Sequence, residues 1–194
     1  LCTKHGIVLI ADEIQIGVGR SGGFFGFEDA GIVPDMVTLS KSISGYGFPL
    51  SILLIDPKLD VWKPAMHTGT FRGNTVALVA ATSALNHFWR DPEFVSGITR
   101  RAEIVRGRLD AIAARHPRLF ATRGRGLLQG LVSIADPEIA VRISRKAFDL
   151  GLIVEVSGAH DEVLKLMPAL LGDEETLLRG LDIIDESVEA IVSS

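Results

Sequence analysis

Residues 6–23 read "GIVLIADEIQIGVGRSGG" and join an apolar run to two acidic residues and a glycine-rich segment. Ile7 to Ile10 is a continuous run of β-branched and leucine side chains, which is typical of a strand buried on both faces. Asp12 follows directly, at the strand end where α/β proteins place their ligands. The stretch therefore has two interpretations: either the Gly17–Gly22 segment binds a dinucleotide, or Asp12 is the functional residue.

The glycines of this stretch fit a dinucleotide fingerprint poorly. That fingerprint needs glycines tight against the strand end and a helix that opens at the third glycine. Here residues 12–16 separate the apolar run from the first glycine, and "GFFGFEDAGIVPD" (23–35) follows the third. This second segment has three more glycines and a proline and leaves little room for a long helix. The sequence therefore disfavours dinucleotide binding.

Strands and helices alternate along the rest of the chain. The patterns predict strands over 36–39, 50–55, 152–156 and 163–167, a glycine turn leading into another strand within "RGRGLLQGLVSI" (123–134), and helices over 75–89, 93–114, 137–150 and 174–192. "RDPEF" (90–94) interrupts the pattern and marks a domain boundary. The alternation predicts α/β architecture, with part of a large domain over 1–92, built on a mainly parallel sheet, and a small α/β domain over 93–194.

Composition excludes several classes of protein. The 194 residues are 47% hydrophobic with a net charge of -4, which predicts a globular core and disfavours a nucleic-acid or membrane partner. A single cysteine predicts a cytoplasmic protein, and the five histidines have no spacing that indicates a metal site. The opening "LCTKHG" resembles the last turn of a helix, so we expect the chain to be the C-terminal portion of a longer protein.

Lys41 is a second candidate residue, because it follows the predicted strand 36–39 and precedes the small-residue segment "SISGYG" (42–47). Pyridoxal phosphate chemistry needs a lysine amine that forms a Schiff base and a carboxylate that faces the ring nitrogen. "HTGTFRGN" (67–74), before the predicted helix, adds hydroxyl and backbone N–H groups suited to a phosphate. Singly, Asp12 could be a loop cap, Lys41 a surface lysine and the loop an ordinary turn. Together they favour a pyridoxal phosphate site.

The stretch "ADEIQIGVGRSGGFFGFEDAGIVPDMVTLSKSISGYGFPLSILL" (11–54) resembles the class III, or omega, aminotransferases of fold type I. The resemblance covers the whole chain as the C-terminal half of such an enzyme. "LSKSISGYG", "LDVWKP" and "GTFRGN" are most similar to the diaminobutyrate–2-oxoglutarate transaminases of ectoine and siderophore pathways. The resemblance implies transfer of the terminal amino group of a diamino acid to or from 2-oxoglutarate by a ping-pong reaction, in a homodimer or larger homo-oligomer with shared active sites.

The resemblance also implies a role for each site residue. Lys41 would carry the cofactor and move the proton, and Asp12 would pair with the ring nitrogen. Ile14 would pack on the ring, and Gln15 would hydrogen-bond near the ring hydroxyl. Thr70 would bind the phosphate of the neighbouring subunit's cofactor.

Substrate recognition is left open by a departure from the family pattern. Where many members have an arginine that holds the keto-acid carboxylate, this sequence has Lys165, and Arg72 or Arg125 could contribute instead, with Arg72 the better candidate. Ornithine, 4-aminobutyrate and diaminobutyrate enzymes share this machinery, so the amino donor is also open. A further alternative is that this chain is a truncated, non-catalytic fragment, since the family's N-terminal phosphate loop and stacking aromatic residue lie outside it.

Overall fold

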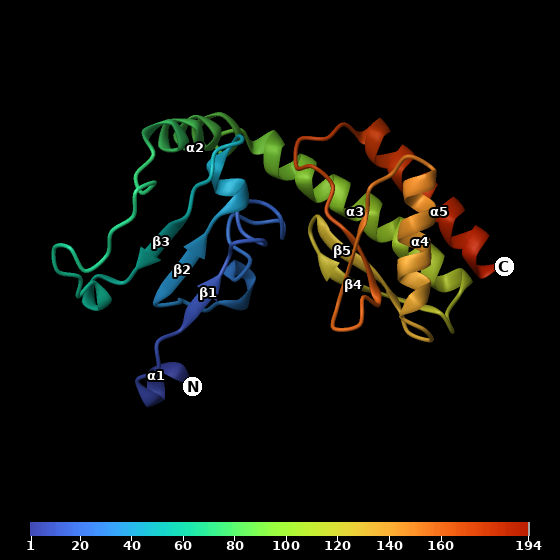
Figure 1. Cartoon of the computed structure of the whole chain (residues 1–194), viewed down its shortest axis with the longest axis horizontal. Helices are drawn as coiled ribbons and strands as arrows, with labels where there is room; N and C mark the ends of the chain where they lie inside the picture. The colour runs from blue at the N-terminus through green and yellow to red at the C-terminus, as the bar shows by residue number, and fades with distance from the viewer. Residues whose placement is uncertain (194) are drawn as a thin grey trace. The chain divides into compact units, whose positions relative to one another are not determined.

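The computed structural model describes residues 1–193, and the chain divides into two compact units, one from Leu1 to Val95 and one from Ser96 onward (Figure 1). The first unit contains α1 (Cys2–His5), β1 (Ile10–Asp12), η1 (Glu28–Ala30), β2 (Met36–Leu39), η2 (Lys41–Ser44), β3 (Ile52–Ile55), η3 (Pro57–Leu59) and α2 (Thr75–Phe88). Helix α3 (Pro92–Arg115) begins in the first unit and continues into the second. The second unit then contains β4 (Phe120–Arg125), β5 (Leu128–Ser133), α4 (Glu138–Asp149), β6 (Glu155–Ser157), β7 (Val163–Leu166) and α5 (Glu174–Val192).

The sheet of the first unit has the strand order β1-β2-β3 (Figure 1). Strands β1 and β2 are parallel, with Asp12 opposite Thr38, whereas β3 runs antiparallel to β2. The predicted parallel layer is therefore present as one parallel pair within a mixed sheet. Because β1 and β2 are parallel, their carboxyl ends lie at the same edge.

The first strand differs from the prediction. The structure begins β1 at Ile10, whereas the apolar run predicts a strand over 7–10 that is buried on both faces. Ile7 and Ile10 are instead 55% and 56% exposed. The physical reason is that β1 lies at an edge of the sheet, because among the described residues only β2 pairs with it.

A small apolar core lies beneath the edge where β1 and β2 end. Val18, Val37, Leu39 and Ile43 are its buried members, and Ala11 of β1 packs against them. Other apolar side chains, most of them from the glycine-rich loop, β3 and the end of α2, also pack against it: Phe24, Phe25, Phe27, Leu50, Ile52, Leu85 and Trp89. Fully burying one such valine, leucine or isoleucine side chain stabilises a fold by about 1.5–3 kcal/mol. This core therefore fixes the positions of the strand ends.

The second unit is built on a four-stranded antiparallel sheet with the order β4-β5-β7-β6. Helix α4 packs against α5 and against β5, β6 and β7. The inward face of α3 carries Ile98, Val105, Leu109 and Ile112 at helical spacing, and each is buried. The predicted helices and the predicted strands at 152–156 and 163–167 are confirmed to within three residues. Strand β4 was not predicted.

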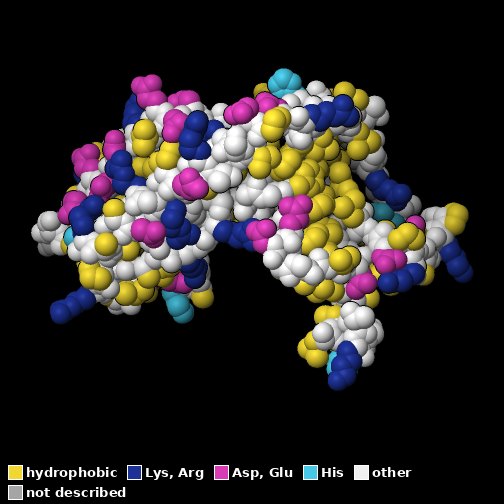
Figure 2. All heavy atoms as spheres, turned by 180° about the vertical axis from the view of Figure 1, so that it is seen from behind, with side chains coloured by type: hydrophobic (Ala, Val, Ile, Leu, Met, Phe, Trp, Pro, Cys, Tyr) yellow, Lys and Arg dark blue, Asp and Glu magenta, His cyan; other side chains and the backbone are white. Residues whose placement is uncertain are grey.

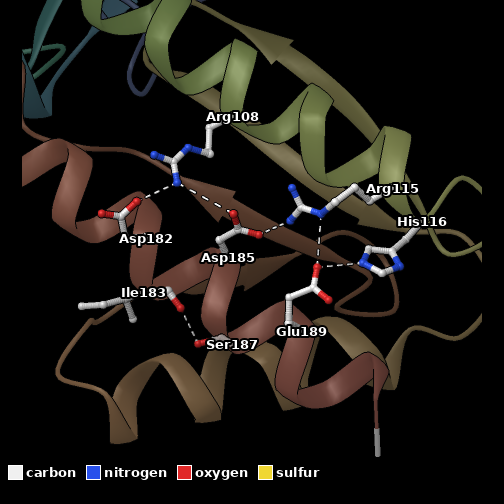
Figure 3. A network of polar contacts seen from close by, with 8 residues as sticks. All are labelled: Arg108, Arg115, His116, Asp182, Ile183, Asp185, Ser187 and Glu189. Atoms are coloured by element: carbon white, nitrogen blue, oxygen red, sulfur yellow. Dashed lines mark hydrogen bonds and ion pairs between the residues drawn. The ribbon is translucent and has the colours of Figure 1, made fainter.

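Charged side chains link α3 to α5 on the surface of this unit (Figure 3). Arg108 contacts Asp182 at 2.6 Å, and Arg115 pairs with Asp185. Glu189 Oε1 lies 3.2 Å from Arg115 Nε and 3.0 Å from His116 Nε2. In the part of the chain that the structure describes, no helix combines the length and the apolar character needed to cross a membrane.

Candidate active site

Asp12 and Lys41 are brought to the same edge of the first sheet. Asp12 is the last residue of β1 and lies opposite Thr38 of the parallel strand β2. Lys41 follows Leu39, the last residue of β2, with one residue between them. The parallel register therefore places Asp12 and Lys41 at neighbouring strand ends.

The Asp12 carboxylate is held by two hydrogen bonds. Its Oδ1 accepts from the backbone N–H of Ile14 at 3.0 Å and from Thr38 Oγ1 at 3.3 Å. Among residues 1–193, these are the two hydrogen bonds that the carboxylate accepts, and both are made to Oδ1. The side chain is exposed and oriented by its neighbours, which suits a carboxylate that is to face a cationic ring nitrogen.

Lys41 lies on a constrained turn. Its backbone φ is 51°, in the left-handed region that L-residues rarely adopt, and its side chain is exposed. Ser40 Oγ donates to the carbonyl of Leu50 at 2.8 Å, and Ile43, two residues after the lysine, is only 3% exposed. Such strained residues persist where the surrounding structure fixes them, and they cluster at functional sites.

The other side of this turn is held by close packing against α2. Gly45 has a φ of 73°, and a Cβ added to it would lie 2.7 Å from Ala84 Cβ and 2.9 Å from the carbonyl oxygen of Ala80. The absence of a side chain therefore lets η2 approach α2 closely. Lys41 therefore lies on a turn that is held on one side by the hydrogen bond of Ser40 and on the other by the packing of Gly45 against α2.

Glu13 is a buried residue that the sequence interpretation passed over. Its side chain is 2% exposed, although it lies between Asp12 and Ile14, which are both exposed. Its Oε2 accepts from the backbone N–H of Gly26 at 2.8 Å, and its own N–H donates to the carbonyl of Thr38 at 3.0 Å. The only sequence signal for this burial is the position of Glu13 between a strand and a loop rich in isoleucine and glycine. The same position also fits a glutamate exposed to solvent.

Three further residues of the 12–23 turn lie close to Asp12 in the chain. Ile14 is 36% exposed, and Gln15 is partly buried. Their predicted contacts with the ring stay predictions. Burial lowers the pKa of the Arg20 guanidinium, which agrees with an interior position in the glycine-rich turn.

The predicted phosphate loop is exposed throughout residues 67–74. Asn74 caps α2, since its Oδ1 accepts from the N–H groups of Val76 at 3.0 Å and Ala77 at 3.2 Å. These two donors at the helix start are therefore already used. Arg72 Nη1 donates to the carbonyl of His67 at 2.6 Å, and within residues 1–193 Thr70 forms no hydrogen bond with Asp12 or Lys41.

Lys165 belongs to the second unit, on β7. It lies opposite Glu155 of β6 in the sheet register, and its Nζ is 2.7 Å from Glu155 Oε2. Its side chain is 18% exposed. The ammonium group is therefore paired within its own unit.

The side chains of Asp12 and Lys41 fit pyridoxal phosphate chemistry. Among the described residues, no group of three or more histidine, cysteine, aspartate or glutamate side chains is placed to hold a metal ion. The amine of Lys41 and the oriented carboxylate of Asp12 match the two groups that the cofactor requires at its aldehyde and at its ring nitrogen.

Known proteins are similar to this chain in sequence and in fold. Residues 1–188 match the family model Aminotransferase class-III. The diaminobutyrate–2-oxoglutarate transaminase of Bordetella parapertussis is 53% identical over 194 residues, which are 100% of this chain and 45% of that protein. The protein of the same name from Virgibacillus pantothenticus is 49% identical over 193 residues, covering 99% of this chain and 46% of the relative. The chain therefore spans about half the length of the curated relatives it matches.

A solved structure agrees with these sequence relatives. The N-acetylornithine aminotransferase of Stenotrophomonas maltophilia aligns with a TM-score of 0.84 at 30% identity, over 99% of this chain and 50% of that one. The shared fold is that of the fold type I enzymes, and the cofactor of the family is pyridoxal 5′-phosphate. On the family match over residues 1–188, the chain belongs to the class III aminotransferases.

Proposed function

We propose that the full-length protein carrying this chain is a transaminase. It moves the terminal amino group of a diamino acid of the 2,4-diaminobutyrate type to or from 2-oxoglutarate. The main support for this chemistry is that Asp12 and Lys41 lie at the carboxyl ends of two adjacent parallel strands. The diaminobutyrate transaminase that is 53% identical supports the choice of amino donor.

Lys41 and Asp12 have different tasks in this proposal. Lys41 Nζ would hold the cofactor until the incoming substrate amine displaces it, and the amine freed in this way would then take and return the substrate proton. Asp12 would keep the cofactor ring nitrogen protonated, and Thr38 and the Ile14 N–H orient its carboxylate. Bound pyridoxal phosphate supplies an electron sink for the substrate carbon. A charge pair at 4 Å in a partly screened site is worth up to about 4 kcal/mol, enough to hold the ring in its protonated form.

The remaining assignments are parts of the same proposal. Ile14 packs on the ring, Gln15 contacts the ring hydroxyl region, and Thr70 binds the phosphate of the other subunit's cofactor in a homodimer. Residues 1–92 belong to the cofactor domain and 93–194 form the small domain. We also propose a cytoplasmic location, which the single cysteine of this chain supports.

Borohydride trapping tests the cofactor site. The full-length protein and the 194-residue chain are each mixed with pyridoxal phosphate, reduced and digested, and the modified lysines are identified by mass spectrometry. We expect labelling of the full-length protein at Lys41, loss of that label in Lys41→Ala, and no change in Lys58→Ala, a surface lysine paired with Asp56 at 2.9 Å. Scattered labelling of the full-length protein would end the proposal. Scattered labelling of the shorter chain alone would make that chain a non-catalytic fragment.

Steady-state kinetics of the full-length protein identify the amino donor. We expect kcat/KM with 2,4-diaminobutyrate to exceed kcat/KM with ornithine and with 4-aminobutyrate. A higher kcat/KM with either of the other two donors would leave the proposed transaminase activity in place and change the proposed amino donor.

Of the three candidate partners for the keto-acid carboxylate, Arg72, Arg125 and Lys165, the first and the last are compared by alanine variants. The Arg72 guanidinium donates to the His67 carbonyl, and the Lys165 ammonium is paired with Glu155. We expect the alanine variant of the true partner to raise the KM for 2-oxoglutarate. The other alanine variant should leave both KM and kcat unchanged, which removes that residue from the site.

A further inference from the structure

Glu13 is a buried acidic side chain for which the proposed reaction has no task. At 2% exposure, an ionised carboxylate is costly unless hydrogen bonds or an opposite charge compensate it. The structure supplies a hydrogen bond of 2.8 Å from the backbone N–H of Gly26 to its Oε2. The side chain therefore ties the residue after Asp12 to a point thirteen positions further along the chain.

The loop encloses this carboxylate closely. A Cβ added to Gly17 would lie 3.1 Å from Glu13 Oε2, and one added to Gly26 would lie 3.2 Å from Glu13 Oε1. The backbone N–H of Gly17 also donates to the Glu13 carbonyl at 3.0 Å. The nearest atoms to these added Cβ atoms are the Glu13 carbonyl oxygen, 2.8 Å from that of Gly17, and Ile16 Cδ1, 2.8 Å from that of Gly26, so the carboxylate lies in a closely packed part of the loop.

Glu13 and Asp12 share a partner, Thr38. The Glu13 N–H donates to the Thr38 carbonyl at 3.0 Å, and the Thr38 hydroxyl donates to Asp12 Oδ1 at 3.3 Å. The direction of the chain immediately after Asp12 is therefore set by Glu13 through one backbone bond to β2 and one side-chain bond to the loop. A shift of Glu13 displaces the Ile14 N–H as well, which is the other donor to Asp12.

We infer that Glu13 is a positioning residue for Asp12: its buried carboxylate, bonded to the Gly26 N–H, holds the strand end so that Asp12 meets the cofactor ring nitrogen. This inference rests on the proposed function and adds to it a residue that touches neither cofactor nor substrate. Glu13 acts through its carboxylate oxygen, which accepts the hydrogen bond from Gly26. Losing this acceptor should change the surroundings of the bound cofactor.

The test uses the full-length protein with pyridoxal phosphate and four changes: Glu13→Ala, Glu13→Asp, Glu13→Gln and Asp12→Asn. Glu28→Gln is the matched control, since Glu28 is an exposed glutamate of the same loop region. Visible absorption and visible circular dichroism report the surroundings of the bound cofactor. A titration gives its dissociation constant, thermal unfolding reports stability, and borohydride trapping shows whether Lys41 is labelled.

Glu13→Ala and Glu13→Asp are expected to move both spectra toward those of Asp12→Asn and to raise the dissociation constant about tenfold, the upper end of the scale for one lost hydrogen bond. Glu13→Gln keeps an acceptor oxygen for the Gly26 N–H and should stay close to the unchanged protein, as should Glu28→Gln. If Glu13→Ala does not fold, Glu13→Asp decides.

Unshifted spectra in the folded alanine or aspartate variant, with Lys41 still labelled, would overturn the inference and leave the proposed function intact. Spectra of Glu13→Gln that match those of Glu13→Ala would also overturn it, because the acceptor oxygen would then not matter. Absence of the Lys41 label in the unchanged protein would overturn both proposals.

Discussion

Asp12 is the residue whose charge the proposed chemistry depends on. Asp12→Asn keeps the shape and the acceptor oxygen that Ile14 and Thr38 contact, and it removes only the negative charge. We expect kcat of the full-length protein to fall by about 100-fold or more, since a charge pair at about 4 Å is worth up to ~4 kcal/mol. Steady-state kinetics measure this effect. Asp60→Asn, a change at an exposed loop aspartate, should leave kcat as it is, and an equal kcat in both variants would contradict the assignment.

Residues at strand ends were predictable, and the buried acid between them was not. Asp12 and Lys41 each follow an apolar run, so the sequence alone placed them at the ends of strands. Glu13 occupies the next position, and no periodicity distinguishes a glutamate that accepts from a distant backbone N–H from one in water. The left-handed conformation of Lys41 was also beyond the sequence, because residues other than glycine rarely adopt it.

The contact between the elements η2 and α2 gives a prediction about stability. Gly45→Ala would bring a methyl group to 2.7 Å from Ala84 Cβ in addition to the cost of a positive φ. Overpacking of this kind costs about 1–3 kcal/mol, and the left-handed backbone adds about 1–2 kcal/mol. We expect a lower thermal midpoint and less borohydride labelling of Lys41, because the turn that carries the lysine must move.

Gly47→Ala is the control for that change. Gly47 also has a positive φ, of 67°, but a Cβ there would meet nothing within 4 Å. It should therefore show the backbone cost alone and keep the Lys41 label. A thermal midpoint for Gly45→Ala no lower than that of Gly47→Ala would show that η2 does not depend on this close approach.

Helices were easier to predict than strands because their signal is longer and more regular. Helix α3 places Ile98, Val105 and Leu109 on one buried face, and this spacing is visible in the sequence. Strand β4 was missed because its residues after Phe120 are small or charged, and most of them are exposed. Its pairing with β5 supplies the structure that its own pattern does not indicate.

The link between α3 and α5 makes stability depend on pH. The hydrogen bond with His116, followed by the contact with Arg115, holds the pKa of Glu189 below its ordinary value of 4.5. A carboxylate with a lowered pKa stabilises the fold above its unfolded pKa, and this contribution is lost as the pH falls through the folded pKa. We therefore expect the thermal midpoint to decrease as the pH is lowered below about 4.5. This decrease should be less steep in Glu189→Gln.

Glu186→Gln is the control for the charge change on the same helix. Glu186 is an exposed glutamate of α5 and is not among the residues of the α3–α5 contact in Figure 3. Its variant should retain the full acid dependence of the unchanged protein. An identical curve of thermal midpoint against pH for Glu189→Gln would assign the acid sensitivity to other carboxylates.

The two units of the molecule differ in how well they bury their apolar side chains. In the second unit the large core side chains Leu109, Leu131, Leu164 and Leu181 are at most 1% exposed. In the first, Leu53 and Leu54 of β3 are each 44% exposed and Phe71 is 92% exposed. Figure 2 shows a broad area of hydrophobic side chains on one face of the first unit. Apolar surface of this extent in one continuous area marks a contact face.

This difference predicts how the chain and its second unit behave in solution. The 194-residue chain is expected to bind a fluorescent hydrophobic dye and to self-associate, because its first unit exposes the apolar area. A shorter chain of residues 91–194 retains Asp91, whose Oδ1 accepts from the Glu93 N–H at 2.9 Å, and keeps the whole of α3. It should unfold cooperatively by circular dichroism and bind little dye. Equal dye binding per mole by the two chains, with the shorter one folded, would show that the apolar face of the first unit is not what makes the chain associate.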